Sequence, residues 1–419
     1  MCDYVKRESY LEKLAIRRDN GEIKIITGPR RSGKSFLLDS IYKDYLVSQG
    51  VPEKNIISIS FDMDDFVRRD LRDRETLKDY LFSRLTSGEE RYYVFLDEIQ
   101  EVDGFERIVN GLNHHDNVDV YITGSNSKFL SSDINTIFRG RGDEVNVRPF
   151  SFKEFVQGRP EPVGELWKEY YTYGGFPALR KLPSAGQKML YLQRLWKKTY
   201  LDDVVERHHV ENREALEAIA DALCSSVGSL TNTSRITNIL SSVRHIRISD
   251  DTVARYIGYL EDAFLFTQAK RYNIKGNRYY ENIKKYYAVD LGLRNARLNF
   301  RQQEVSHIME NVIFNELTER GYAVDVGVVE HRKMVDGKPR YLQYEVDFIA
   351  TDGYEKYYIQ SAFELGGDAK REQELNSLTR IDDSFRKIVI EGADIMPYQD
   401  EKGILYMGLI QFLQSGKLS

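Results

Sequence analysis

The 419-residue sequence contains only two cysteines, nine prolines and two tryptophans. Cys2 and Cys224 stand too far apart in the chain to suggest a zinc site and give no disulfide framework, which fits a reducing compartment. No apolar run approaches the ~20 residues that span a membrane. Residues 1–8 lack the apolar core of a signal peptide. We therefore expect a cytoplasmic protein with no membrane partner.

The sequence also lacks a strong excess of charge of one sign, because its net charge is −5. Bulk charge therefore does not attract nucleic acid, and any surface that binds it must be local. Internal repeats and low-complexity segments are absent. With 41 % hydrophobic residues, the chain is long enough for two to four domains with their own cores.

One glycine-rich stretch carries a clear chemical signal. Residues 28–35 read GPRRSGKS and match G-x-x-x-x-G-K-[ST], the pattern of a phosphate-binding loop. A β-branched run at residues 23–27 precedes it, and apolar residues at helical spacing follow it up to Gly50. Between a strand and a helix, such a loop binds phosphate through backbone N–H groups and the helix dipole. The expected ATP-binding residues are Gly28, Pro29, Arg30, Arg31, Ser32, Gly33, Lys34, Ser35 and Phe36.

Magnesium is the cofactor expected beside ATP. Lys34 should contact the β- and γ-phosphates, and the hydroxyl of Ser35 should ligate Mg²⁺. A second apolar strand at residues 91–96 leads into Asp97 and Glu98, as a Walker B element does. We expect Asp97 to hold Mg²⁺, and Glu98 to orient the attacking water or accept its proton.

Two polar segments follow the acidic pair. The strand at residues 118–122 leads to Ser125 and Asn126, which would face the γ-phosphate if this strand lies between the other two. Ordinary turn chemistry is the alternative. Arg139 or Arg141 precedes a short strand at residues 145–148 and could act as an arginine finger, within the chain or from a neighbouring subunit. A solvated arginine pair is the alternative there.

Together these segments resemble one family. Residues 30–35, 96–100, 122–126 and 140–155 are similar to the prokaryotic AAA-type ATPases that carry a C-terminal domain of unknown role. The resemblance runs over nearly the whole chain. It implies an AAA-type core with the sensor strand between the other two, and it supports Arg141 as the arginine of the family's Gly-Arg motif.

The expected fold is α/β, beginning with a P-loop NTPase parallel sheet at residues 1–150. Residues 151–200 read as helices interrupted at residues 174–177, and the resemblance implies a lid beside the nucleotide. Within residues 201–290, three helical patterns precede short strands at residues 264–266 and 285–289. This order is the outline of a winged helix, and the resemblance agrees.

The charges of the winged-helix segment do not decide between DNA and protein as its partner. Its third helix carries Asp250, Asp251, Glu261 and Asp262 against Arg255 alone, which disfavours phosphate contact. The hairpin is basic and could lie along a DNA backbone. Its basic residues are Lys270, Arg271, Lys275, Arg278, Lys284 and Lys285. Protein contacts with a solvated basic loop are the alternative.

Residues 291–419 resemble a restriction-endonuclease-like fold, with a helix at 310–317 and strands at 342–349, 357–363 and 387–390. Active members place an Asp before Glu-x-Lys to hold Mg²⁺ and activate water. Asp347 matches and Glu310 could assist, but Gln360 and Ala362 replace the Glu and the Lys. Lys370 could substitute for the missing lysine. We expect a degenerate, non-cleaving domain that serves recognition or assembly.

The sequence thus predicts an ATP-dependent molecular switch in which hydrolysis moves the lid and the C-terminal part. The expected catalytic residues are Lys34, Glu98, Asn126 and Arg141. An ATP-regulated nuclease that uses Asp347 is one alternative, and a non-hydrolysing scaffold held by ATP is another. Sequence leaves the oligomeric state open, including a homo-oligomer.

Overall fold

The computed structural model describes residues 4–61, 69–86, 90–124, 138, 140–301, 304–335, 338–366, 368–416 and 418. The chain forms two compact units. Unit 1 comprises Met1–Pro149 with Phe176–Ala178, and unit 2 comprises Phe150–Gly175 with Leu179–Ser419. The expected end of the first domain, residue 150, lies beside this boundary. The further divisions at residues 200 and 290 stay predictions.

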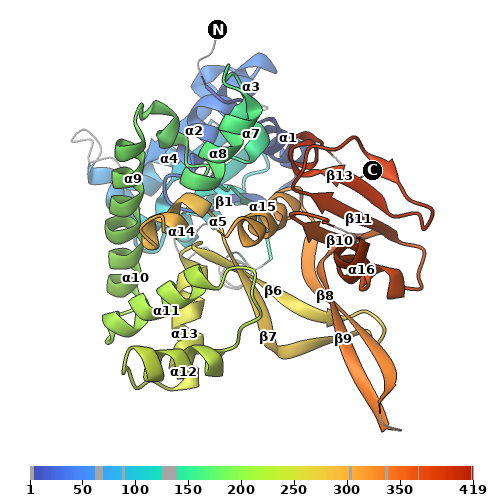
Figure 1. Ribbon diagram of the computed structural model, residues 1–419. Coiled ribbons are helices and arrows are strands. Elements are labelled where there is room, and N and C mark those ends of the chain that lie inside the picture. The colour runs from blue at the N-terminus through green and yellow to red at the C-terminus, as the bar shows by residue number, and fades with distance from the viewer. Residues whose placement is uncertain are drawn as a thin grey trace. The chain divides into compact units, whose positions relative to one another are not determined.

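Unit 1 is built on a parallel sheet, drawn in blue to cyan in Figure 1. Among the described residues, five strands follow the order β2-β3-β4-β1-β5. Their bounds are β1 (Ile23–Thr27), β2 (Ile56–Ser60), β3 (Tyr92–Asp97), β4 (Val118–Thr123) and β5 (Gly142–Asn146). The strand β4 therefore lies between β1 and β3, as the sensor strand was expected to.

Helices cover both faces of this sheet because β1, β3 and β4 are buried along their whole length. Ile25 packs into a core with residues of α4 and α5, and Ile26 packs into a core with α1 and the helix after the loop. The helices are α1 (Glu8–Arg17), α2 (Lys34–Phe36), α3 (Lys43–Ser48), α4 (Arg74–Phe82) and α5 (Phe105–Asn113). A π-helical segment at Leu37–Tyr42 joins α2 to α3.

The strand expected at residues 145–148 begins earlier than the sequence suggested, because β5 spans Gly142–Asn146. Its polar residues have partners inside the unit. Asp143 accepts a hydrogen bond from Arg17 at 2.8 Å, and Glu144 accepts one from Thr27 at 2.6 Å. Tertiary contacts thus compensate for the low strand propensity of Gly, Asp and Glu.

Unit 2 begins with helices, as expected. Gly174, with φ of 77°, follows α8 and ends it. The helices are α7 (Phe152–Val156), α8 (Val163–Tyr173), α9 (Ala185–Arg194), α10 (Asp202–Arg207), α11 (Arg213–Ser225), α12 (Thr233–Val243), α13 (Asp250–Asp262), α14 (Leu291–Arg297), α15 (Val305–Glu319), α16 (Asp368–Leu375) and α17 (Leu409–Gln414). A π-helical segment, Leu195–Leu201, joins α9 to α10.

The strands of unit 2 form a mixed sheet. In the part of the chain that the structure describes, eight strands follow the order β12-β13-β11-β10-β9-β8-β6-β7. They are β6 (Phe266–Asn273), β7 (Arg278–Ala288), β8 (Ala323–Val335), β9 (Lys338–Asp352), β10 (Glu355–Ala362), β11 (Arg386–Glu391), β12 (Tyr398–Gln399) and β13 (Leu405–Gly408). Figure 1 shows the long β8–β9 hairpin extending away from the rest of this sheet. Because β6 pairs in parallel with β8, the sheet continues across residue 290.

The basic loop that the sequence suggested between two short strands is mostly strand. The β6–β7 ladder pairs Phe266 with Ala288 at one end and Asn273 with Arg278 at the other. Only the turn at residues 274–277 separates the two strands. The alternation of a strand therefore turns some of its basic side chains inward.

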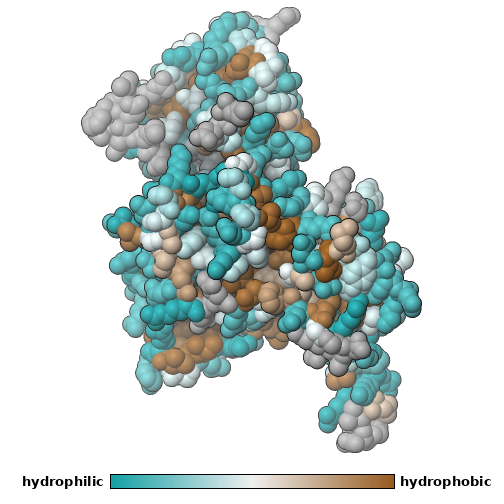
Figure 2. Space-filling view, turned by 45° about the horizontal axis from the view of Figure 1, so that its top comes forward, coloured by the Kyte–Doolittle hydropathy of each residue, from teal (hydrophilic) through white to brown (hydrophobic). Residues whose placement is uncertain are grey.

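The face of the molecule in Figure 2 is mostly hydrophilic, with hydrophobic side chains in small separate patches. Among the residues that the structure describes, no helix is both long and apolar enough to cross a membrane.

Candidate functional site

The glycine-rich loop leaves the carboxyl end of β1 in a conformation that requires glycine. Gly28 has φ of 131°, and a Cβ atom there would lie 2.1 Å from the carbonyl oxygen of Val147. Gly33, with φ of 97°, precedes the helix that starts at Lys34. Both residues adopt the left-handed region that L-residues with side chains avoid. The loop therefore wraps closely against the backbone after β5.

The ammonium group of Lys34 is anchored inside this loop. Its Nζ donates hydrogen bonds to the carbonyl oxygens of Gly28 and Pro29, each at 3.1 Å. The side chain is only 3 % exposed, and Nζ lies 3.8 Å from Oε1 of Glu98. A buried cation fixed at the mouth of a glycine loop is a suitable partner for phosphate oxygens.

Asp97, at the end of β3, accepts hydrogen bonds from hydroxyl groups of the loop and of the ends of β2 and β4. Its Oδ1 accepts hydrogen bonds from Ser35 at 2.9 Å and Thr123 at 2.6 Å. Its Oδ2 accepts one from Ser60 at 3.0 Å. Burial raises the pKa of Asp97, and the hydroxyl donors counter that shift. Ser35 and Asp97, the two expected magnesium ligands, therefore lie side by side although 62 residues separate them.

These oxygen atoms fit magnesium by their chemistry. Mg²⁺ takes hard oxygen ligands and commonly uses one or two protein side chains, with water and phosphate oxygens as the rest. The Ser35 hydroxyl and the Asp97 carboxylate supply such a pair. No group of three or more His, Cys, Asp or Glu within the described ranges is placed to hold a metal by itself. Ser35 and Asp97 are thus two oxygen-bearing side chains, as many as a magnesium site commonly takes from a protein.

Glu98 stands in a strained backbone conformation directly after β3. Its φ is 53°, in the left-handed region that non-glycine residues rarely adopt. Its N–H donates to the hydroxyl of Thr123 at 2.9 Å, and its carboxylate accepts a hydrogen bond from the Gln100 amide. This turn directs the Glu98 side chain toward Lys34 and the loop.

Thr123 is a site residue that the sequence reasoning missed. The prediction placed Ser125 or Asn126 here, and both lie outside the described residues. Thr123 ends β4, is fully buried, and uses one hydroxyl to contact both Asp97 and Glu98. A polar residue at the end of a buried strand was the available signal, but the same pattern also fits an ordinary strand residue.

Arg7 also contacts the loop, and no sequence pattern predicted this contact. It donates hydrogen bonds to the carbonyl oxygens of Ser32, at 2.9 Å, and Arg148, at 2.6 Å. The Ser32 hydroxyl itself is buried and has no partner within the described part of the chain. Such a group needs a ligand or water to satisfy it.

Some of the other predicted site residues have side chains that form no hydrogen bond or ion pair with Lys34, Asp97 or Glu98 in the described part of the chain. Phe36 is 46 % exposed and packs edge-on against Tyr4, and Arg31 is exposed. Arg141 lies at the start of β1, where its carbonyl accepts a hydrogen bond from the N–H of Ile23. Four strand residues, about 13 Å, separate that point from Thr27 and the loop. Arg139 lies outside the described residues.

Unit 2 contains a buried ion cluster made of Lys285, Glu310, Glu345 and Asp347. The Lys285 Nζ lies 2.8 Å from carboxylate oxygens of both Glu310 and Glu345, and 3.9 Å from Asp347. Tyr287 also donates to Glu310 at 2.7 Å. Burial raises the pKa of Asp347 to about 8. The alternation of the strand thus places Glu345 and Asp347 on one face, as expected.

The basic hairpin is less exposed than the sequence suggested. Lys285 belongs to the buried ion cluster, and Arg271 is only 6 % exposed. Lys275 pairs with Asp382 at 3.1 Å, and Lys284 donates to Gln268 at 2.6 Å. Lys285 and Arg271 are therefore not available to a DNA backbone, so the basic surface of the hairpin is smaller than the sequence suggested.

The parallel sheet, the glycine loop after β1 and the acidic end of β3 define unit 1 as a P-loop NTPase fold. Residues 20–156 match the family described as an AAA domain, and residues 164–304 match a domain of unknown function. Unit 1 is therefore of the AAA type.

Relatives match nearly the full chain. An "Uncharacterized protein" of Haemophilus influenzae is 36 % identical over 93 % of this chain and 93 % of its own length. The protein belongs to the same family as this relative. An uncharacterized protein of Methanocaldococcus jannaschii is 28 % identical over 91 % of this chain and 83 % of its own.

Among solved structures, AMPPCP-bound DnaA from Aquifex aeolicus is 15 % identical over 61 % of this chain and 88 % of its own, with a TM-score of 0.31. A score this low carries no statement about function.

Proposed function

We propose that unit 1 binds ATP with Mg²⁺ and hydrolyses it, so that the protein works as a molecular switch. One observation carries this proposal. Ser35 and Asp97 share a 2.9 Å hydrogen bond, and Lys34 and Glu98 approach to 3.8 Å beside the same loop. Two motifs that are far apart in sequence thus meet at the glycine loop.

Each residue has a separate task in this proposal. The loop N–H groups and Lys34 bind the phosphate tail, and Ser35 with Asp97 would hold the metal. Magnesium, when bound, neutralises phosphate charge. Glu98 orients the attacking water through its carboxylate, while Thr123 fixes the backbone of that turn. The site needs only positioning and charge neutralisation to promote in-line attack.

Arg141 lies beside the first residue of β1, at the end of the strand opposite the glycine loop. We infer that this is too far for it to contact phosphate bound in its own chain. We therefore propose that Arg141 contacts the nucleotide of a neighbouring copy, as an arginine finger within a homo-oligomer. Asn126 remains a proposed partner of the γ-phosphate.

A phosphate-release assay tests this function. Glu98→Gln should keep ATP binding and lose turnover about 100-fold or more, because a positioned base contributes that much. Lys34→Ala should weaken binding of the phosphate tail. Glu101→Gln and Lys43→Ala serve as controls, since they make the same changes at exposed or half-exposed positions nearby. Wild-type turnover in both Glu98→Gln and Lys34→Ala would refute the proposal, and tight ATP binding without release would favour the scaffold alternative.

For unit 2 we propose a winged-helix-like part, α11 to β7, and a degenerate restriction-endonuclease-like part that serves recognition. Support for the second comes from the order α15, β8, β9, β10, α16, β11, in which β9 runs antiparallel to β8 and β10, and β11 runs parallel to β10. The Lys285 ammonium already neutralises Glu310 and Glu345, which leaves less negative charge to attract a metal.

One observation favours the nuclease alternative. Active members of the fold carry a lysine at the position of Ala362, on β10. Here Lys285, from β7, lies beside Asp347 instead. Lys370, the substitute considered from sequence, belongs to α16. Incubation of the full chain with DNA and Mg²⁺ decides between the two. Cleavage that Asp347→Ala abolishes would establish the nuclease, and no cleavage would support the recognition role.

A further inference from the structure

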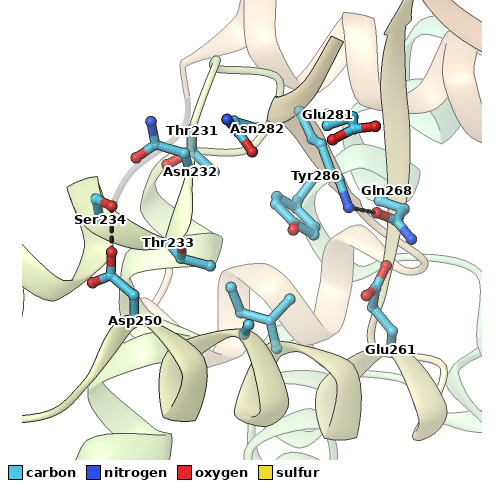
Figure 3. Close-up of a pocket in the computed structure, with 13 residues that line it drawn as sticks. Thr231, Asn232, Thr233, Ser234, Asp250, Glu261, Gln268, Glu281, Asn282 and Tyr286 are labelled. Carbon is cyan, nitrogen blue, oxygen red and sulfur yellow. Dashed lines mark hydrogen bonds between the residues drawn. The ribbon is translucent and has the colours of Figure 1, made fainter. Parts of the chain in front are cut away.

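Unit 2 contains a cleft of about 550 Å³ that is separate from the buried ion cluster (Figure 3). Its walls are the start of α12, one side of α13 and the β6–β7 hairpin. A volume in this range is typical of sites for small molecules or short peptide segments. Polar side chains form most of its lining.

Two largely buried residues bring hydroxyl groups to this cleft. Tyr286 is 7 % exposed and Thr231 is 4 % exposed, and both line the cleft. The residues that the structure describes form no hydrogen bond to either hydroxyl, and neither oxygen is fully buried, so both are open to the cleft. Figure 3 shows the Tyr286 ring extending from the hairpin into the space above α13. Both hydroxyls are thus available to a polar ligand that enters the cleft.

The charged side chains of the cleft are mainly acidic. Asp250, Glu261 and Glu281 line it with a single lysine, Lys284. Lys284 donates to the Gln268 amide at 2.6 Å, and Asp250 accepts a hydrogen bond from Ser234. The other two carboxylates of the lining are Glu281 and Glu261, and Glu261 also accepts a hydrogen bond from the backbone of Gln268.

Burial raises the pKa of Glu261 to about 7, although Lys284 opposes the shift. The neighbouring Asp262 on α13 raises it further. A bound cation would stabilise the charged form of this carboxylate.

We propose that this cleft binds a guanidinium group, with the carboxylates of Glu261 and Glu281 and the hydroxyls of Tyr286 and Thr231 as its acceptors. A guanidinium offers five N–H donors, whereas an ammonium offers three. The four acceptors come from four separate positions around the cleft, which a planar group with several donors satisfies best. Phosphates of a nucleic acid would meet like charge here.

Isothermal titration calorimetry on the full chain tests this site with two probes. Agmatine represents a free guanidino compound, and the tripeptide acetyl-Gly-Arg-Gly-amide represents an arginine of a polypeptide. The same tripeptide with citrulline in place of arginine is the matched neutral probe and should not bind. An agmatine affinity equal to that of the arginine peptide identifies a small-molecule source, and a tenfold tighter peptide identifies a polypeptide.

Variants locate the binding. We expect Glu261→Gln to weaken either guanidino probe about tenfold, because a hydrogen bond to a charged group is lost. Tyr286→Phe keeps the ring and should weaken binding by a smaller factor. Glu214→Gln makes the same charge change on an exposed position of α11 and should leave binding unchanged.

Three outcomes would overturn the proposal. These are no heat with either guanidino probe at millimolar concentration, equal affinity of the wild type and Glu261→Gln, or equal affinity for the citrulline peptide. Duplex DNA binding that Lys284→Gln removes, together with silent guanidino probes, would assign the cleft to nucleic acid instead. Circular dichroism of each variant confirms that the fold is intact.

Discussion

A single hydroxyl group links the two acidic residues of the candidate ATP site. Thr123 donates to Asp97 and accepts from the N–H of Glu98, so it orients a proposed metal ligand and a proposed base at once. Residues that orient metal ligands from behind commonly matter almost as much as the ligands themselves.

We expect Thr123→Val to lower magnesium-dependent phosphate release by about 10- to 100-fold. Valine keeps the shape of threonine, but Asp97 loses a 2.6 Å hydrogen bond and its pKa rises further. Steady-state release measured against Mg²⁺ concentration should show a higher metal requirement. Thr123→Ser restores the hydroxyl and should recover most of the activity. Unchanged turnover and metal requirement in Thr123→Val would contradict this role.

Asp347 makes folding stability depend on pH. Burial raises its pKa from 3.8 to about 8, so the folded chain keeps a proton that the unfolded chain releases near pH 4. Its contribution to stability is therefore fully present below about pH 4 and is lost as the pH rises to about 8. We expect the free energy of unfolding to fall over this range by as much as about 1.4 kcal/mol per pH unit for this one proton.

Urea denaturation at pH 5, 6, 7 and 8 measures this dependence. Asp347→Asn keeps an acceptor for the N–H of Ser361 but has no proton to lose, so its slope should be flatter. Asp352→Asn, on an exposed position of the same strand, should keep the wild-type slope. Equal slopes for the wild type and Asp347→Asn would show that the carboxyl is ionised in the folded chain.

At the scale of elements, the loop after β1 depends on its contact with the chain after β5. Gly28 approaches the carbonyl of Val147 so closely that any side chain would collide with backbone, and Val147 donates in turn to the carbonyl of Thr27. The ends of β1 and β5 and the glycine loop therefore pack directly against one another.

Gly28→Ala should consequently separate the loop from β5. We expect a loss of at least 1–3 kcal/mol from backbone strain, together with loss of nucleotide binding. Differential scanning fluorimetry and titration with a fluorescent ATP analogue measure the two effects. Gly164→Ala makes the same change inside α8, where nothing lies within 4 Å, and should stabilise by about 0.5–1 kcal/mol. Wild-type binding in Gly28→Ala would show that the loop tolerates displacement.

At the scale of the whole molecule, the chain divides into two compact units, and the proposed nucleotide site belongs to unit 1 alone. A ligand stabilises the state that binds it by mass action, so nucleotide should act unequally on the two units. Apart from Phe176–Ala178, which belong to unit 1, the residues that match the domain of unknown function all belong to unit 2.

Differential scanning calorimetry of the full chain should therefore show two transitions, one of which responds to ATP with Mg²⁺. At a nucleotide concentration 100 times Kd, the gain is about 2.7 kcal/mol for unit 1. Lys34→Ala should abolish the shift, and Lys43→Ala should keep it. A single transition that shifts as a whole would mean that the units unfold together.

The sequence by itself determined the elements whose signals are local. A β-branched run, a glycine loop and a helical pattern are neighbours in the chain, so their order alone predicts that Lys34 and Ser35 contact phosphate. The acidic end of β3 follows from the same kind of local pattern. The core strands at residues 342–349 and 387–390 were also predicted within a few residues, because alternation and apolar runs reflect burial directly.

Only the tertiary structure decided which distant residues meet. Thr123 contacts Asp97 because β4 and β3 are neighbours, and Lys285 is buried because it meets Glu310 from α15 and Glu345 from β9. By sequence alone, Lys285 is one more basic residue of a solvated hairpin. A lysine is stable inside a protein only beside compensating charge, and that charge comes from elements that no local pattern connects to it.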